Sequence, residues 1–449
     1  MKAFSFPRGG ISLEDTSAPR PDSCATSFLP ALSLVPLSGC AGARPAPLVS
    51  AGDRVGEGMP VGRGVPGVCA DAHASVPGTV VRIESWEDGE GRPCEGVLVR
   101  MKGSFDRLGT YADDGAPEIA PASIGLAGLL GALDGCGVVE MEDSGRPLSA
   151  VIRAFLGTAG GQGDTLVVRC VMDDPWQVAD HVLCRERMRA VVLAAFAVAG
   201  ACGLGRVVLA FSRATADIGR SFIAEADVLR GSVGVSLPVS AIAVGEKYPQ
   251  RNARELALAV REWGRASGIE PGAILPLGPV TLAAVYDALR FRRPPLERYV
   301  AVGGSAVRTP AVMRARIGKR VGDLFDECGG FVAPPVRIVR GSPFFGERVR
   351  FLDEPVTRTT HALAAMLGPQ IGAASPHSCI SCGECRWVCP VDLDPEAMYK
   401  TVMVSRAEGG APHPGFADCH GCGCCELVCP SRLPIAETVR GVSLEGGYA

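Results

Sequence analysis

Two cysteine runs near the C-terminus constrain this chain more than any other feature of its sequence. Each run has three cysteines at every third position and a fourth cysteine directly before a proline. The first run is Cys379, Cys382, Cys385 and Cys389, and the second is Cys419, Cys422, Cys425 and Cys429. Three thiolates from one tight loop, with a fourth cysteine before proline, are the ligands with which a chain holds [4Fe–4S] clusters. The spacing therefore predicts a ferredoxin domain with two such clusters over residues 371–440.

The fourth cysteine of each run binds the cluster of the other run in this arrangement. We therefore expect one cluster on Cys379, Cys382, Cys385 and Cys429, and the other on Cys419, Cys422, Cys425 and Cys389. Zinc sites use two Cys-x-x-Cys pairs or add histidine, so zinc explains the double pattern less well, and so does a disulfide framework. Cys424 departs from the spacing, and we expect it to fill space beside a cluster.

Composition excludes several classes of protein. A chain of 449 residues is long enough for three or four domains, and 47% hydrophobic with 21% charged residues is typical of globular proteins. The net charge of −3, without long basic runs, argues against nucleic acid as a partner. The N-terminus lacks the apolar core of a secretory signal, and the longest apolar run, residues 190–205, is shorter than the ~20 residues of a membrane span.

Residues 1–112 are rich in glycine and proline, with short β-type stretches. The clearest part, residues 51–81, contains the strand–turn–strand sequence HASVPGTV. This pattern resembles the barrel-sandwich folds of biotinyl and lipoyl carriers, but no lysine stands at the hairpin tip to carry a group. We interpret His73, the first residue of that sequence, as a structural surface residue rather than a ligand.

The middle of the chain alternates apolar strands with helices. Over residues 115–265, strands are expected at 164–171, 206–211 and 234–244, and helices at 147–158, 180–202 and 252–263. Apolar strands between helices predict a doubly wound parallel α/β domain. Residues 275–365 predict a small β-grasp-like α+β module. The expected fold class is therefore multidomain α/β and α+β: a barrel-sandwich domain, a doubly wound domain, a β-grasp-like module and a two-cluster ferredoxin domain.

Several short motifs, taken in this order, resemble the C subunit of the Rnf-type ion-translocating ferredoxin:NAD oxidoreductase complex. No single motif is specific, but their order along the chain is. They are Arg8-Gly9-Gly10-Ile11, the HASVPGTV hairpin, residues 173–181 (DDPWQVADH), Lys247-Tyr248-Pro249-Gln250, Cys328-Gly329-Gly330-Phe331, residues 341–346 (GSPFFG) and the two cysteine runs. A microcompartment cobalamin reductase has the same parts but places its flavin domain first.

The resemblance implies an electron-transfer subunit of an ion-translocating oxidoreductase (translocase). It would lie peripherally on the cytoplasmic face of the bacterial inner membrane. Its two [4Fe–4S] clusters would pass electrons between a nicotinamide- or ferredoxin-side donor and the membrane subunits. The partners implied are the other subunits of that complex, with soluble ferredoxin or NADH as further partners. The domain over residues 115–265 would correspond to the family's flavin/NADH-type domain, like that of a 51-kDa subunit.

The sequence departs from the family where FMN and NADH would bind. The family's loop reads Gly-Gly-Ala-x-Phe-Pro-Thr, whereas this chain has IGLAGLLGAL over residues 124–133, with Leu129 and Leu130 obstructing close backbone approach. The family's Asn-Gly-Ala-Glu-Cys-Glu-Pro run is also altered, with Arg169 for the asparagine and Met172 for the first glutamate. These changes weigh against binding of FMN or NADH and leave intrinsic NADH oxidation open. The alternatives are a redox-inert docking or assembly scaffold and a soluble flavin-dependent iron–sulfur reductase.

Overall fold

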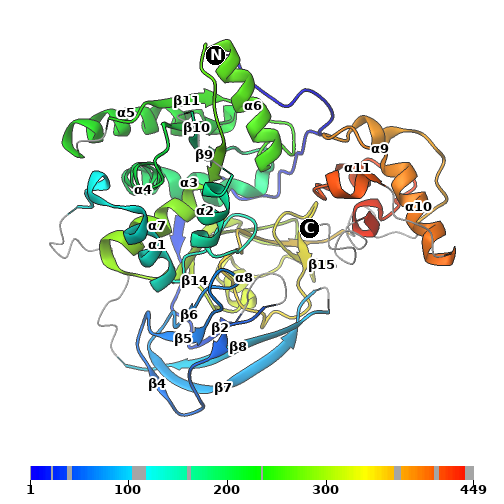
Figure 1. The fold of residues 1–449 in the computed structure, drawn as a ribbon. Coiled ribbons are helices and arrows are strands. Elements are labelled where there is room, and N and C mark those ends of the chain that lie inside the picture. The colour runs from blue at the N-terminus through cyan, green and yellow to red at the C-terminus, as the bar shows by residue number, and fades with distance from the viewer. Residues whose placement is uncertain are drawn as a thin grey trace.

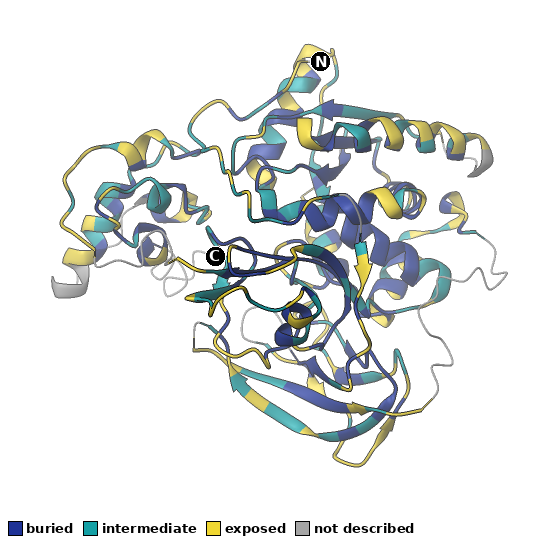
Figure 2. Cartoon of the chain, turned by 180° about the vertical axis from the view of Figure 1, so that it is seen from behind, coloured by how far each residue is buried: buried dark blue, intermediate teal, exposed yellow. Residues whose placement is uncertain are grey.

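The computed structural model gives the arrangement of four modules along the chain (Figure 1). It describes residues 2–21, 24–37, 43–89, 91–103, 118–158, 163–233, 236–368, 376–408 and 414–439. The expected domain limits at residues 112, 371 and 440 lie outside these ranges. Buried residues gather on the central helices and strands (Figure 2).

The N-terminal β module consists of two sheets packed on a valine-rich core. One sheet has the order β2-β8-β7-β4 and the other β3-β5-β6. The strands are β2 (Leu32–Pro36), β3 (Ala46–Pro47), β4 (Arg54–Val55), β5 (Pro60–Arg63), β6 (Ala72–His73), β7 (Gly78–Glu87) and β8 (Pro93–Met101). Val35, Val61 and Val97 lie in the core between the sheets. This is the barrel-sandwich arrangement expected for this region.

His73 is buried, with 7% of its surface exposed, so the expectation of a surface residue is wrong. The α/β module covers it: a β-carbon at Gly137 would lie 3.0 Å from the His73 ring. That contact joins residues 64 positions apart and could not be read from the local turn pattern.

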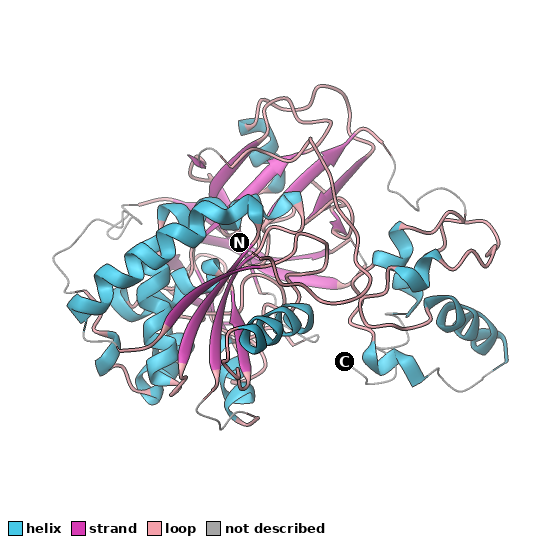
Figure 3. Cartoon of the chain, turned by 90° about the horizontal axis from the view of Figure 1, so that it is seen from above, coloured by secondary structure: helices cyan, strands magenta, loops and turns pink. Residues whose placement is uncertain are grey.

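A four-stranded parallel sheet forms the centre of the α/β module. The strands are β9 (Thr165–Cys170), β10 (Arg206–Phe211), β11 (Val239–Ala243) and β12 (Ile274–Leu277), in the order β11-β10-β9-β12. All three pairings are parallel. Alternate residues of β9 point to opposite faces, so Leu166 and Val168 enter one core and Val167 the other. Helices lie on both faces, as Figure 3 shows from above.

The helices of this module divide between the two faces of the sheet. Helix α6 (Ala253–Ala266) packs on the face of Val167. The opposite face carries α1 (Leu126–Gly135), α2 (Leu148–Leu156), α3 (Val178–Glu186), α4 (Met188–Ala201), α5 (Ala216–Val233) and α7 (Pro279–Phe291). Short 3-10 turns are η1 (Pro121–Ser123), η2 (Pro175–Gln177) and η3 (Arg213–Thr215). Strand β12 and helix α7 extend the module past residue 265, because β12 pairs with β9.

A six-stranded mixed sheet forms the third module, with the order β1-β14-β13-β17-β15-β16. Its elements are β1 (Cys24–Thr26), β13 (Glu297–Gly303), β14 (Ala311–Arg316), α8 (Val321–Glu327), β15 (Arg337–Arg340), β16 (Glu347–Arg348) and β17 (Ala362–Met366). Phe325 of α8 packs on a core that includes Val300 and Leu363. Strand β1 pairs in parallel with β14, so part of the N-terminal segment contributes to this sheet rather than to the first module.

The cysteine-rich module lies to one side of the molecule, at the right of Figure 1 in orange and red. It contains α9 (Glu384–Trp387), α10 (Pro395–Glu408), η4 (Pro414–Asp418) and α11 (Cys424–Leu427). Met398, Val402, Phe416, Leu433 and Ile435 form its small core. In the ranges that the structure describes, no helix has the length and apolar character needed to cross a membrane.

Candidate metal centres

The eight cysteines of the two runs line two separate cavities. The first cavity, of about 370 Å³, is lined by Cys379, Cys382, Cys385 and Cys429. The second cavity, of about 430 Å³, is lined by Cys389, Cys419, Cys422 and Cys425, with Cys424 also on its wall. Each cavity therefore takes three thiols from one run and one from the other. Their division is the same as that of the two predicted ligand sets.

The two runs fold into nearly identical loops. Each loop passes through a left-handed glycine, Gly383 with φ of 80° and Gly423 with φ of 83°, and then enters a one-turn helix. Only glycine adopts this backbone conformation without strain, which explains why it follows the second cysteine of each run. After the turn, three cysteines of the run line the same cavity, and the chain continues to the fourth.

Backbone amides donate to the sulfur atoms in these loops. The Ser381 N–H donates to Cys379 Sγ at 3.4 Å, and the Leu393 N–H donates to Cys389 Sγ at 3.3 Å. Such bonds stabilise negative charge on sulfur, as an iron–sulfur centre requires. Burial raises the pKa of Cys385 to about 11, so a metal would displace protons when it binds here.

Cys424 differs from its neighbours in its surroundings. It is fully buried, and its Sγ lies 4.0 Å from the Tyr248 carbonyl oxygen. A hydrogen bond from the Cys424 thiol lowers the pKa of Cys422 to about 7, and the same bond raises the pKa of Cys424. Cys422 is thus the better thiolate of the two, and the role of Cys424 in filling space stays a prediction.

The donor set fits a cluster better than a single ion. Among the described residues, no three Cys, His, Asp or Glu side chains gather closely enough to bind one metal ion. The four thiols of each set instead surround a cavity. Four sulfur ligands spread around a cavity suit a polynuclear centre, whereas zinc draws its ligands to within ~2.3 Å of one point.

The carboxyl edge of the parallel sheet is the second place where a cofactor would be expected. In doubly wound sheets, nucleotides bind outside the carboxyl ends of the strands, where the strand order reverses. Here the order reverses between β9 and β12. Any group bound there would face the N-terminus of α7, which begins just after β12 at Pro279.

Glu142 occupies that N-terminus. Its carboxylate accepts hydrogen bonds from the Thr281 N–H at 3.0 Å and from the Thr281 hydroxyl, and the side chain is almost fully buried. A side chain at Gly278 would collide with the Glu142 carboxylate. The first amides of a helix are those that bind phosphate. In this chain, an internal carboxylate takes that position.

Buried ion pairs lie beside Glu142 at this edge of the sheet. The Arg169 guanidinium, 4% exposed, lies 2.8 Å from Glu140 and 2.6 Å from Asp143. The Arg251 guanidinium lies 3.0 Å from Asp180, and its backbone N–H donates to Asp173 at 2.9 Å. These charges neutralise one another in the place where a bound nucleotide would carry charge.

Residues 124–133, which replace the family's phosphate-binding loop, form most of helix α1 and the residues just before it. Gly125 precedes the helix with φ of −82°, and within residues 124–133, all of which are described, no backbone φ is positive. Leu129 is fully buried in the main core, and Leu130 packs against that core. The segment therefore offers a packed helix rather than a ring of backbone amides.

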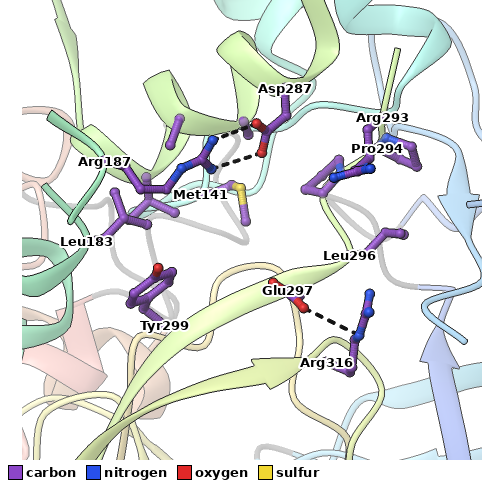
Figure 4. Close-up of a pocket in the computed structure, with 14 residues that line it drawn as sticks. Met141, Leu183, Arg187, Asp287, Arg293, Pro294, Leu296, Glu297, Tyr299 and Arg316 are labelled. Carbon is purple, nitrogen blue, oxygen red and sulfur yellow. Dashed lines mark hydrogen bonds and ion pairs between the residues drawn. The ribbon is translucent and has the colours of Figure 1, made fainter. Parts of the chain in front are cut away.

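A third cavity, of about 540 Å³, lies between α7, the end of α3 and strand β13 (Figure 4). Arg187 and Asp287 form a two-point ion pair on its wall, at 2.9 and 2.6 Å, and Glu297 lies 3.5 Å from Arg316. These charged groups pair with each other rather than point toward a ligand. None of the residues 124–133 lines this cavity.

The chain is similar to known proteins over most of its length. Residues 5–104 match the family model described as the RnfC barrel sandwich hybrid domain. The chain is 27% identical over 423 residues to the C subunit of the ion-translocating oxidoreductase complex of Rhodobacter capsulatus, and the match covers 92% of this chain and 77% of that protein. It is 25% identical over 381 residues to the C subunit of the Na(+)-translocating ferredoxin:NAD(+) oxidoreductase complex of Acetobacterium woodii, covering 82% and 80%. The resemblance to the Rnf C subunit is thereby confirmed.

A chain of a solved NAD+-reducing [NiFe]-hydrogenase in the air-oxidized state matches with a TM-score of 0.49 and 14% identity. The match covers 73% of this chain and 62% of the hydrogenase chain.

Proposed function

We propose that this chain, similar over most of its length to the C subunits of ion-translocating oxidoreductases, is an electron-transfer subunit of such a complex. It would relay electrons through two [4Fe–4S] clusters between a nicotinamide- or ferredoxin-side donor and the membrane subunits. The observation that carries this proposal is the division of eight thiols between two cavities, each with one thiol from the opposite run.

The residues suit the holding of two linked centres. A [4Fe–4S] cluster, when bound, accepts and releases one electron at a time. Cys379, Cys382, Cys385 and Cys429 would hold one cluster, and Cys389, Cys419, Cys422 and Cys425 the other. Because each run contributes to both sets, the two sites form one folding unit. Exchange of ligands between the runs also keeps the two sites adjacent, as a relay requires.

We further propose that electrons enter from a partner protein rather than from a flavin on this chain. Three observations support a relay without FMN or NADH. Glu142 occupies the N-terminus of α7, Arg169 is buried in ion pairs at the same edge, and Leu129 lies in the core. A bound phosphate would have to displace the Glu142 carboxylate, which is already bonded to the amide it would need.

The place of this chain in a membrane complex is proposed from its relatives. Their names describe complexes that translocate ions, and the C subunit is one component of each. We propose that this chain associates peripherally with the membrane subunits on the cytoplasmic face of the bacterial inner membrane. Because Glu142 takes the helix amide that a nucleotide phosphate would need, soluble ferredoxin is the donor that we propose.

The proposal is tested by the absorption spectrum of anaerobically reconstituted protein. The chain is loaded with iron and sulfide, extracted for flavin, and then mixed with reduced ferredoxin or with NADH. The ferredoxin is removed by gel filtration before the spectrum is recorded, because its own cluster absorbs in the same region. We then expect the visible absorption of the chain's [4Fe–4S] clusters to be bleached after ferredoxin and little changed after NADH, with no extractable flavin. One flavin per chain with bleaching by NADH would overturn the relay without flavin, and no iron uptake would overturn the whole proposal.

A further inference from the structure

We propose that Tyr248 and Phe345 are positioning residues for the loop 419–425, and that they set the reduction potential of the second cluster apart from that of the first. This inference rests on the proposed function. Neither residue is a predicted ligand, and each belongs to a different module of the body. Together they form an aromatic pair with ring centroids 4.5 Å apart and planes inclined by 14°.

Tyr248 attaches the loop through a hydrogen bond to its backbone. The Tyr248 hydroxyl donates to the Cys422 carbonyl at 2.9 Å, across 174 positions of sequence. The backbone of Tyr248 is itself held by Ile11, whose N–H donates to the Tyr248 carbonyl at 3.0 Å, and whose carbonyl accepts from the Tyr248 N–H at 2.7 Å. The hydroxyl is therefore presented to the loop by a fixed support.

Phe345 covers the tightest point of the loop. A β-carbon at Gly423 would lie 2.7 Å from the Phe345 ring, closer than any real contact of this kind. Gly423 is thus needed twice, for its positive φ and for the approach of the ring. Gly423 itself is buried, between Cys422 and Cys424.

Helix α6 holds the same loop from another side. The His420 ring lies 3.0 Å from the Glu255 carboxylate and 3.1 Å from the Asn252 side-chain amide. Glu255 is fully buried, so this contact joins the loop to the interior of the α/β module. The second loop is therefore clamped between Tyr248, Phe345 and α6.

The first loop has no comparable cover among the residues that the structure describes. A β-carbon at Gly383 would meet only Trp387 Nε1, at 3.9 Å, and Trp387 is 80% exposed. Ile380, next to Cys379, is 66% exposed. Reduction adds negative charge to a cluster, and water stabilises that charge. The covered second site should therefore have the lower reduction potential of the two.

The first experiment is a redox titration followed by electron paramagnetic resonance on the full chain with both clusters loaded. We expect Phe345→Ala to raise the potential of the second cluster, because water reaches Gly423, and to leave that of the first unchanged. The inference is overturned if the two clusters of the unaltered chain have equal potentials. It is also overturned if Phe345→Ala shifts neither potential or shifts both. If the unaltered chain binds no clusters, the proposed function itself fails, so the two failures are distinguishable.

Two matched pairs test positioning without relying on potentials. Gly423→Ala and Gly383→Ala impose the same backbone strain, because both glycines have φ near +80°, but only the first meets Phe345. We expect Gly423→Ala to lose more iron than Gly383→Ala.

The second pair tests the tyrosine. Tyr248→Phe removes the bond to Cys422, whereas Tyr399→Phe removes a hydroxyl beside the first cavity. We expect a chelator to take iron from the second site faster in Tyr248→Phe only. Equal behaviour within each pair would contradict the inference.

Discussion

At the scale of single residues, Glu142 holds the start of α7 through its hydrogen bonds to Thr281. The cysteines proposed as ligands follow a local spacing, so the sequence alone groups them. The Glu142 carboxylate accepts a hydrogen bond from Thr281, 139 positions away. Only the pairing of β12 with β9 brings the two residues together. Leu129 stands out in the sequence for its bulk, but its burial depends on the core that α1 enters.

Removal of the Glu142 carboxylate should loosen the start of α7. Glu142→Ala leaves the Thr281 N–H and the Thr281 hydroxyl hydrogen without acceptors in the interior, while the hydroxyl oxygen still accepts from the Met141 N–H; the cost is about 2 kcal/mol. Amide hydrogen exchange in α7 should then be roughly 30-fold faster. Glu87→Ala is the control, since Glu87 is exposed on β7 and should change exchange little. Unchanged protection of α7 in Glu142→Ala would contradict the assignment.

The buried His73 should make the N-terminal module sensitive to acid. Burial, with a further contribution from Arg358, lowers the pKa of His73 to about 4, from 6.5 in the unfolded chain. Between these values the unfolded state binds more protons, so stability falls as pH falls through that window. The loss between about pH 7.5 and about pH 5 is about 2 kcal/mol for this group.

Urea unfolding, followed through hydrogen exchange of β7 and β8, measures this loss. His73→Gln should abolish that part of the pH dependence, whereas His377→Gln, at an exposed histidine, should retain it. The same acid sensitivity in His73→Gln and in the unaltered chain would show that another group is responsible.

At the scale of elements, hydrophobic periodicity located the strands well and the helix ends less well. The strand expected at residues 206–211 is β10, with the same limits. The helix expected over 180–202 is instead two helices, α3 and α4, which meet at Arg187. Arg187 leaves helical geometry, with φ of −121°, and forms its ion pair with Asp287 of α7. No glycine or proline marks this break, so the local sequence does not reveal it.

The proposed crossing of ligands between the two loops predicts which variants share a defect. Cys382→Ser and Cys429→Ser should lose the same resonance signal, since both thiols line the first cavity. Cys389→Ser and Cys422→Ser should both lose the other signal. Cys424→Ser should keep both signals. If Cys382→Ser and Cys389→Ser instead share one loss, each run holds its own cluster.

At the scale of the whole molecule, the order of modules was readable from short motifs, but their contacts were not. The Lys247-Tyr248-Pro249-Gln250 motif pointed to the family, yet its contact with Cys422 depends on how the last module packs against the sheet edge. Likewise, the pairing of β1 with β14 joins segments almost 290 positions apart. Contacts of this range follow from the packing of modules rather than from local pattern.

The proposed place of the chain in a membrane complex predicts its behaviour on fractionation. Within the described ranges there is no membrane-spanning helix, so attachment would depend on partner subunits. In a host with the other subunits, the chain should sediment with membranes and be released by alkaline carbonate. Cys382→Ser should sediment equally well but fail to pass electrons, whereas loss of attachment with the cluster would favour a scaffold role.

The most direct test of the account is a Mössbauer spectrum of the anaerobically isolated chain, together with its iron, sulfide and zinc content. We expect about eight iron and about eight sulfide per chain, the spectrum of [4Fe–4S] centres, and negligible zinc. Stoichiometric zinc would contradict the proposal of two clusters. So would an iron content of fully loaded protein that is enough for one cluster only.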